Sequence, residues 1–443
     1  MKLWQKNTTV NEAVDAFTVG QDRVLDMHLA KFDVLGSLGH TRMLGSIGLL
    51  EEEELKLIQI GLKKIYADIV NGDFSIAEDV EDIHSQIEFL LTKEIGESGK
   101  KIHAGRSRND QVLVDLKLYF RHEIEEIVVL VKQVFTLFQG LSEQHKAVLL
   151  PGYTHLQIAM PSSFGLWFGA YAESLVDDLE LMLAAWKVTN KNPLGSAAGY
   201  GSSFPLDRQE TTDLLGFKSM NYNVVYAQMG RGKVERIIAQ GLSAIAATLA
   251  KFAMDACLYM NQNFGFIRFP DNLTTGSSIM PHKKNPDVLE LIRARCNKIQ
   301  ALPNEIALMT ANLPSGYHRD LQLLKEALFP AFTSLKECLL ILQLMLEHIE
   351  VNTGIMKDAK YDYLFSVEVV NNLVLEGMSF RDAYKHIGLM IENGTYEPLK
   401  AINHTHEGSI GNLMNDVIKE EFEGVYNAFE FDKVKEKLVG LVL

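Results

Sequence analysis

The chain has 443 residues, of which 47% are hydrophobic and 23% are charged, and its formal net charge at pH 7 is −14. This length suffices for two or three domains, or for one long helical core with smaller units attached, and the composition is that of an ordinary globular protein. The acidic balance argues against a nucleic-acid scaffold, because neutralising phosphates requires a basic surface.

Neither a disulfide framework nor a metal site is predicted, because the cysteines have no paired spacing. There are three of them: Cys257, Cys296 and Cys338. The N-terminal segment has no apolar core and no cleavage signal, which predicts a cytoplasmic location. The most hydrophobic long run, 237–260, is interrupted by Lys251 and Asp255. Since a membrane span would leave those charges in lipid, a buried core helix is predicted instead.

The fold class is predicted to be mainly α, because apolar residues recur at helical spacing and no stretch alternates like a strand. The longest periodic segments are 111–138, 161–188, 234–260, 288–313 and 329–349. Breaks in the pattern divide the chain into an N-terminal helical domain (1–105), a central long-helix bundle (106–356) and a small C-terminal helical domain (357–443). The apolar faces exceed what one bundle would bury, which predicts a homo-oligomer with a multi-helix core.

The first polar stretch whose side chains could bind a ligand or take part in a reaction is 101–111. It reads K-I-H-A-G-R-S-R-N-D-Q and lies directly before a long apolar helix. Arg106 and Arg108 can each bind a carboxylate through two N–H groups, and Asn109 or Asp110 can cap the helix. Taken alone, this pattern is more typical of a solvated helix start.

The second stretch is 150–161, L-P-G-Y-T-H-L-Q-I-A-M-P, where a Pro-Gly turn is followed by Thr154 and His155. We expect these two residues just before a helix. A lone histidine is more often structural than catalytic, so the residues alone favour no role for His155.

The third stretch is 271–295, which joins the hydroxyl-bearing loop T-T-G-S-S to two lysines and a helix start. Gly276 relaxes the backbone and predicts a mobile loop. Asn285 fits a helix N-cap and Pro286 the first helical position. A cation beside a helix N-terminus can hold a carboxylate and stabilise negative charge that develops next to it.

The fourth stretch is 316–326, G-Y-H-R-D-L-Q-L-L-K-E. A polar helix face would account for Lys325 but not for the whole pattern.

These stretches resemble one known family. The string G-S-S-I-M-P-H-K-K-N-P-D closely resembles the signature G-S-S-x-M-P-x-K-x-N-P of the fumarase/aspartase superfamily, whose members release fumarate by β-elimination. The double lysine and the strings G-R-S-R-N-D-Q, P-G-Y-T-H-L-Q and Y-x-x-D-L-Q-x-x-K are similar to the argininosuccinate lyase branch. The resemblance covers essentially the whole length, with its strong matches in these four stretches.

The resemblance implies a carbon–nitrogen lyase of arginine biosynthesis that cleaves argininosuccinate to arginine and fumarate, with no cofactor and no metal. It also implies a cytoplasmic homotetramer in which three of the four subunits contribute to each site. The catalytic residues it implies are Ser277, His155, Lys283 and Glu290. The substrate-binding residues it implies are Thr18, Arg106, Ser107, Arg108, Asn109, Thr154, Asn285, Tyr317, Gln322 and Lys325. A supporting role for His84, in D-I-H, is a weaker expectation.

The implied reaction removes a proton next to a carboxylate, so the main task is to stabilise a doubly charged aci-carboxylate. Lys283 and the helix start near Asn285 suit that task. Ser277 would act as base if Lys283 stabilised its alkoxide, and His155, oriented by Glu290, would protonate the leaving nitrogen. The residues leave open which of Ser277 and His155 is the base; we favour Ser277.

Several positions depart from the family pattern and keep alternatives open. Ile158 and Met160 replace the usual Arg and Gln, Ala104 replaces a common Thr, and Arg319 stands where Lys is usual. His282 gives some weight to another fumarate-releasing lyase, such as adenylosuccinate lyase. An N-acylated argininosuccinate is a further candidate substrate. A helical structural homologue without turnover is the alternative from a different class.

Overall fold

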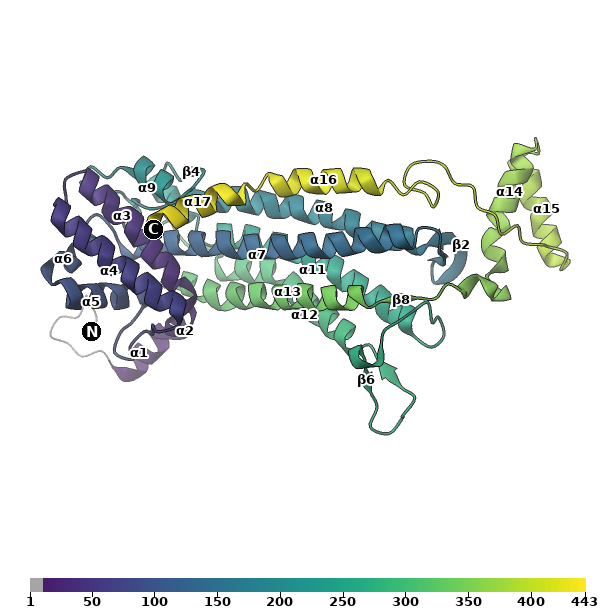
Figure 1. Cartoon of the computed structure of the whole chain (residues 1–443), viewed down its shortest axis with the longest axis horizontal. Coiled ribbons are helices and arrows are strands. Elements are labelled where there is room, and N and C mark those ends of the chain that lie inside the picture. The colour runs from purple at the N-terminus through teal and green to yellow at the C-terminus, as the bar shows by residue number, and fades with distance from the viewer. Residues whose placement is uncertain (1–10) are drawn as a thin grey trace.

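The structure, a computed structural model, describes residues 11–443 as an elongated and mostly helical molecule (Figure 1). Long helices lie side by side along its length, with a compact unit at one end and a small projecting unit at the other. The predicted mainly α fold class is confirmed.

The N-terminal unit packs around an apolar core of its own, which includes Val34, Ile58 and Ile87. Its helices are α1 (Glu12–Val19), α2 (Asp22–Asp26), α3 (Ala30–Ser46), α4 (Glu52–Asn71), α5 (Ile83–Ile95) and α6 (Glu97–Lys100). The acidic run at the start of α4 forms a capping box between the N-cap Glu51 and Glu54 of the first turn, which satisfies backbone N–H groups there.

Five long helices form the central bundle, and each overlaps one of the segments with helical periodicity. They are α7 (Arg108–Gln144), α8 (Phe164–Thr189), α11 (Lys233–Met260), α12 (Asp287–Met309) and α13 (Leu323–Glu347). At 1.5 Å per residue, the 37 residues of α7 span about 55 Å. This length separates the two ends of the molecule and decides which predicted site residues can meet within one chain.

Two helical stretches of the described chain, Lys233–Met260 and Arg319–Glu347, are long and apolar enough to cross a membrane. Within their most apolar windows, 61% and 50% of the residues are buried inside the protein. A helix that is apolar on most sides is also what the centre of a large bundle requires.

The strands form four two-stranded sheets: β1 (Leu149–Thr154) with β2 (Gln157–Ser163), β3 (Lys191–Asn192) with β4 (Ser219–Met220), β5 (Ile267–Arg268) with β8 (Glu350–Val351), and β6 (Thr275–Gly276) with β7 (Lys284–Asn285). Among the strands of residues 11–443, only β3 and β4 run parallel. Two short helices, α9 (Arg208–Leu214) and α10 (Val224–Met229), lie in the connection between α8 and α11.

The C-terminal region divides into a projecting pair and two returning helices (Figure 1). Helices α14 (Ser366–Leu375) and α15 (Phe380–Glu392) share a small core of their own. Helices α16 (Asn415–Asn427) and α17 (Phe431–Val442) run back along the bundle and place Phe422 and Phe431 in the main core. The three-domain division stays a prediction, and this packing limits the separate C-terminal unit to the part with α14 and α15.

Candidate active site

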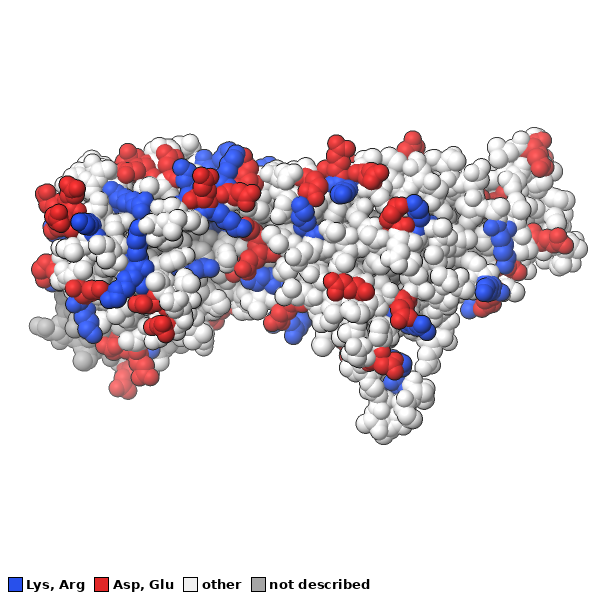
Figure 2. Space-filling model, viewed as in Figure 1, with Lys and Arg blue, Asp and Glu red and all other residues white. Residues whose placement is uncertain are grey.

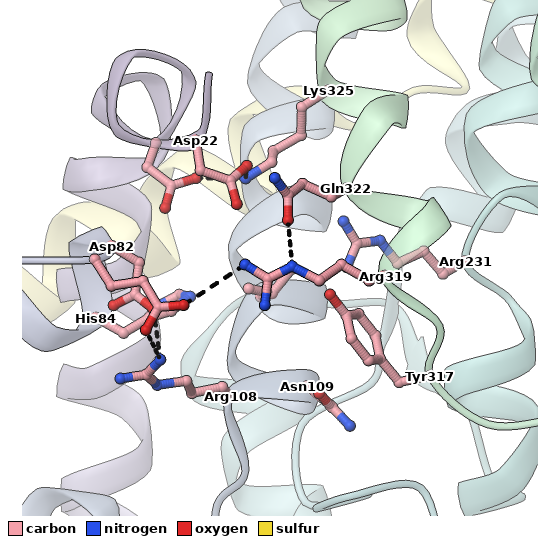
Figure 3. A pocket seen from close by; sticks show the side chains of 13 residues that line it. Asp22, Asp82, His84, Arg108, Asn109, Arg231, Tyr317, Arg319, Gln322 and Lys325 are labelled. Atoms are coloured by element: carbon pink, nitrogen blue, oxygen red, sulfur yellow. Dashed lines mark hydrogen bonds and ion pairs between the residues drawn. The ribbon is translucent and has the colours of Figure 1, made fainter. Parts of the chain in front are cut away.

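A pocket of about 240 Å³ lies at the N-terminal end of the bundle, where α2, α5, the start of α7 and the segment before α13 meet (Figure 3). Five of the residues predicted to bind substrate line it: Arg108, Asn109, Tyr317, Gln322 and Lys325. Most of its other lining residues are charged, which suits a polar, charged ligand rather than an apolar one.

The first turn of α7 forms one wall of the pocket. Ser107 is the N-cap, and its hydroxyl oxygen accepts from the backbone N–H of Asn109 at 3.2 Å. Asp110 in turn accepts from the backbone N–H of Ser107 at 2.8 Å. The capping residue is therefore Ser107, and not Asn109 or Asp110 as expected. Arg108 is held against the wall by Asp82 at 3.0 Å and by the hydroxyl of Ser85 at 2.7 Å.

Arg106, for which the resemblance implies substrate binding, does not line the pocket, and that role stays a prediction. Its guanidinium is buried and donates to the hydroxyl of Ser37 at 3.0 Å and to the carbonyl of Ile102 at 2.9 Å. Gly105, with φ +72°, allows the left-handed turn that comes directly before Arg106. Arg106 thus joins α3 to the start of α7.

Lys325 closes the opposite wall from α13. It lies 2.6 Å from a carboxylate oxygen of Asp22 and 2.6 Å from one of Asp26, two acidic residues one helical turn apart on α2. Burial alone would lower the pKa of Lys325, but the two carboxylates outweigh burial and raise it. For the carboxyl of Asp22 burial acts in the other direction: it raises the pKa, and the opposing effect of Lys325 is smaller. Lys325 is therefore a charged group with two partners already in place.

Thr18 approaches this wall through its backbone rather than through the hydroxyl we expected to bind substrate. Its carbonyl accepts from Arg319 at 2.6 Å and from Gln322 at 3.1 Å. Its hydroxyl donates to the carbonyl of Val14 at 2.8 Å, within α1. The end of α1 is thereby tied to the turn that leads into α13.

His84 lies at the base of the pocket and is almost fully buried. Its Nδ1 is hydrogen-bonded to Asp33 and lies 3.5 Å from Asp115. Burial would lower the pKa of His84, but the Asp33 carboxylate outweighs burial and raises it. Burial and the adjacent Asp33 carboxylate raise the pKa of Asp115 well above its usual value.

These three side chains could hold a metal ion by geometry, since their ligand atoms lie within 4.8 Å of one another. A proton on His84 would compete with such an ion, because the imidazole nitrogen that bonds Asp33 must then donate. In the second group of this kind in the described chain, His122 with Glu123 and Glu126, Lys336 already contacts both glutamates and would compete with an ion. The expectation of no metal stays a prediction.

His155 lies at the opposite end of the bundle, at the tip of the β1–β2 hairpin. Residues Thr154 and Gln157 pair across a two-residue turn made by His155, with φ 53°, and Leu156, with φ 58°. The expected helix after His155 is therefore wrong: a strand follows, and α8 begins only at Phe164. Thr154 and His155 are both exposed there.

Ser277 lies in a segment that projects from the bundle between β6 and β7 (Figure 1). On the face seen in Figure 2, the outer end of this projection carries no acidic or basic side chain. The Ser277 hydroxyl oxygen accepts from the backbone N–H of Met280 at 3.2 Å. Asn285 lies in β7, and α12 begins at Asp287 with Pro286 as N-cap, one residue later than predicted.

A second, more open hollow of about 560 Å³ lies at the base of this projection. Lys283, Asn285 and Glu290 line it together with Cys257 and His282. Within one described chain the predicted residues thus form three separate groups: the pocket, the hairpin tip and the projecting loop.

Three comparisons with known proteins bear on this arrangement. A lyase family profile matches residues 7–301. The argininosuccinate lyase of Parabacteroides distasonis is 61% identical over 435 residues, which cover 98% of each chain. That of Thermotoga neapolitana is 40% identical over 386 residues, which cover 87% of this chain and 97% of the other.

The chain belongs to the argininosuccinate lyase family.

Solved structures agree on the fold of this family. An EDDS lyase variant with bound fumarate has a TM-score of 0.74 at 19% identity, covering 98% of this chain and 94% of the other. A class II fumarase from Schistosoma mansoni has a TM-score of 0.72 at 14% identity, covering 94% of each chain. At such identities these neighbours show the helical-bundle fold alone.

Sequence reasoning missed most of the acidic residues of the pocket. Asp22 and Asp26 face Lys325 from α2, and Glu81 and Asp82 face Arg108. Asp22 and Asp26 are four residues apart at a helix start, and this spacing indicates that both side chains lie on the same face of the helix. Only the packing of α2 against α13 shows that this face points at a lysine 300 residues away.

Proposed function

We propose that this protein is an argininosuccinate lyase, which cleaves argininosuccinate to arginine and fumarate by β-elimination. The observation that carries the proposal is identity of about 60% to argininosuccinate lyases over nearly the whole chain, together with a pocket lined by the family's Arg108–Asn109 and Tyr317–Lys325 residues. The reaction places the enzyme among the carbon–nitrogen lyases of arginine biosynthesis.

In this proposal the pocket holds the amino-acid end of the substrate, and the chemistry takes place where the other two groups join it. Ser277 removes the proton, Lys283 and the start of α12 stabilise the doubly charged intermediate, and His155 protonates the leaving nitrogen. Glu290 orients His155. His155 is exposed and Ser277 is half-buried in the projecting loop, so neither side chain is enclosed in the core of its own bundle, and this supports the assignment.

We further propose that the protein is a cytoplasmic homotetramer with active sites shared between subunits. Its support is the length of α7, since about 55 Å of helix lies between the pocket wall at Arg108 and the hairpin that follows. A site containing both groups therefore needs side chains from more than one chain. Several large apolar side chains on the bundle helices are exposed in the single chain, among them Leu291, Leu308 and Leu340, which is typical of an interface.

The test is an assay of the purified protein that follows the absorbance of fumarate. We expect release from argininosuccinate, and none at comparable enzyme concentration from adenylosuccinate. Release from adenylosuccinate alone would assign the chain to the other branch, and no release from either would contradict the proposal that it is a fumarate-releasing lyase.

A further inference from the structure

Arg319 lies at the rim of the pocket, in the turn Arg319–Gln322 that leads into α13, at the position where lysine is usual (Figure 3). Its Nε donates to Oε1 of Gln322 at 3.1 Å, and its Nη2 donates to the carbonyl of Thr18 at 2.6 Å. The same Nη2 lies 3.6 Å from a carboxylate oxygen of Glu81. One guanidinium therefore joins three segments that are far apart in the sequence.

These contacts determine which way the Gln322 amide faces. Its Nε2 donates to the carbonyls of Thr18 at 3.1 Å and Val19 at 3.2 Å, which uses both of its N–H groups. The reverse orientation would set the amide oxygen against two carbonyls and the amide NH₂ against the N–H of Arg319. What the Gln322 side chain can still offer a ligand is the second lone pair of Oε1, so it can accept a hydrogen bond but not donate one.

The cations that line the pocket already have partners. Lys325 contacts Asp22 and Asp26, and Arg108 contacts Asp82 at 3.0 Å. Arg319 lies 3.6 Å from Glu81, and Arg231 lies 4.0 Å from Glu235. In the described lining, the charges on arginine and lysine are thus matched by carboxylates. Such a lining suits a zwitterion, whose own charges cancel, better than a ligand with a carboxylate and no cation.

We propose that Arg319 is a positioning residue that makes this pocket select an amino acid with a free α-ammonium group over its Nα-acylated counterpart. The ammonium donates to Oε1 of Gln322, which Arg319 holds in place together with the Thr18 and Val19 carbonyls that accept from the same amide. Acylation removes the positive charge and adds atoms that a pocket of about 240 Å³ must also hold. The inference rests on the proposed function, because it takes this pocket as the site of the amino-acid end of the substrate.

The first experiment compares fumarate release from argininosuccinate and from Nα-acetyl-argininosuccinate. In the wild type we expect kcat/KM to favour the free amine by at least about a hundredfold, since charged hydrogen bonds contribute roughly that much. In Arg319→Met we expect KM for argininosuccinate to rise about tenfold, kcat to stay within about threefold, and the preference to fall at least about tenfold.

Two variants control for the loss of an arginine as such. Arg319→Lys keeps an N–H donor within reach of Gln322 and should restore most of the preference. Arg268→Met removes an exposed arginine that is paired with Glu350 at 2.6 Å, and should leave both substrates within about twofold of the wild type. A preference that is unchanged in Arg319→Met, or equally reduced in Arg268→Met, overturns the inference.

The second experiment needs no turnover and separates this inference from the proposed function. Calorimetric titration of the wild type should show arginine binding at least about tenfold tighter than Nα-acetylarginine, and Arg319→Met should reduce that ratio. Equal binding of the two overturns the inference even if argininosuccinate is cleaved. Absence of fumarate release from every substrate contradicts the proposed function, while the titration still decides the selectivity of the pocket.

Discussion

His155 and Leu156 occupy a backbone conformation that is costly for residues other than glycine. Both have φ above 50° in a two-residue hairpin turn, where Asn-Gly is the favoured pair. Each such residue costs about 1–3 kcal/mol, and the cost is tolerated where the surroundings impose it and the position has a use. The turn places an exposed imidazole at the outermost point of the hairpin, where another subunit could receive it.

His84 gives the clearest prediction for a single residue. Its pKa is raised by Asp33, so the charged form is bound more tightly in the folded protein than in the unfolded chain. The stability from this pair is fully present below the unfolded histidine pKa of about 6.5, and is lost as pH rises through the higher folded value. His84→Gln should therefore lower the free energy of unfolding by about 3 kcal/mol at pH 6, and by less at pH 9.

Denaturant unfolding at the two pH values measures this difference. His348→Gln is the matched control, because His348 is exposed and bonds only a backbone carbonyl in its own helix. His348→Gln should leave the free energy of unfolding unchanged at either pH. If His84→Gln lowered the free energy of unfolding equally at pH 6 and pH 9, the ion pair with Asp33 would not be what stabilises the fold here.

At the scale of elements, the long helices were predictable because their apolar periodicity is a local property. The residues at which these helices begin and end were harder to predict. Helix α13 begins at Leu323 rather than at Phe329, and runs through Pro330 inside the helix. Proline removes one backbone hydrogen bond and favours a boundary, but the packing of Leu324 and Leu328 in the main core outweighs that loss.

The β1–β2 hairpin was not predicted, for a related reason. Its turn lacks the glycine or asparagine that would mark it, and Pro151 with Gly152 suggested a turn four residues too early. In the candidate site, too, local sequence patterns were predictive and tertiary contacts were not. Motif strings led to Arg108, Tyr317 and Lys325, whereas the acidic residues opposite them depend on contacts between distant segments.

Helix α16 offers a test of how the C-terminal region is divided. The ring of Phe422 is fully buried and stacks on Phe135 of α7, with ring centroids 3.8 Å apart. Phe422→Ala should lower the free energy of unfolding by about 3–5 kcal/mol, because it leaves a cavity in the main core. Phe380→Ala on α15 removes a ring that is 60% exposed and should cost no more than about 0.5 kcal/mol. Equal losses in the two variants would contradict the assignment of α16 to the central core.

At the scale of the whole molecule, the residues proposed for the active site form three separate groups within one chain. The pocket lies at one end of α7, the hairpin follows its other end, and the loop with Ser277 projects from the side (Figure 1). Elongation of this kind is costly for a monomer, since it exposes apolar helix faces that an oligomer would bury. The shape and the divided site thus favour the same explanation, a site assembled between copies.

Mixed assemblies provide the decisive measurement. Ser277→Ala and His155→Asn should each reduce kcat at least about a hundredfold, with sedimentation unchanged, because His155 is exposed, Ser277 is half-buried and neither belongs to an apolar core. If the two residues of one site come from different chains, refolding an equal mixture of the two variants restores intact sites. Each needed side chain is then present with a probability of about one half, so about a quarter of the sites recover.

The matched control mixes Ser277→Ala with Lys283→Ala, two variants of the same projecting segment. Ser277 and Lys283 belong to the same loop of one chain, so every chain in this mixture has a loop that lacks one of them. Activity should therefore stay at the level of the single variants. Recovery in the first mixture and not in the second supports a site shared between subunits. An inactive first mixture, with tetramers formed, would mean that His155 and Ser277 act from one chain, and the length of α7 would then leave only the pocket to come from a different chain.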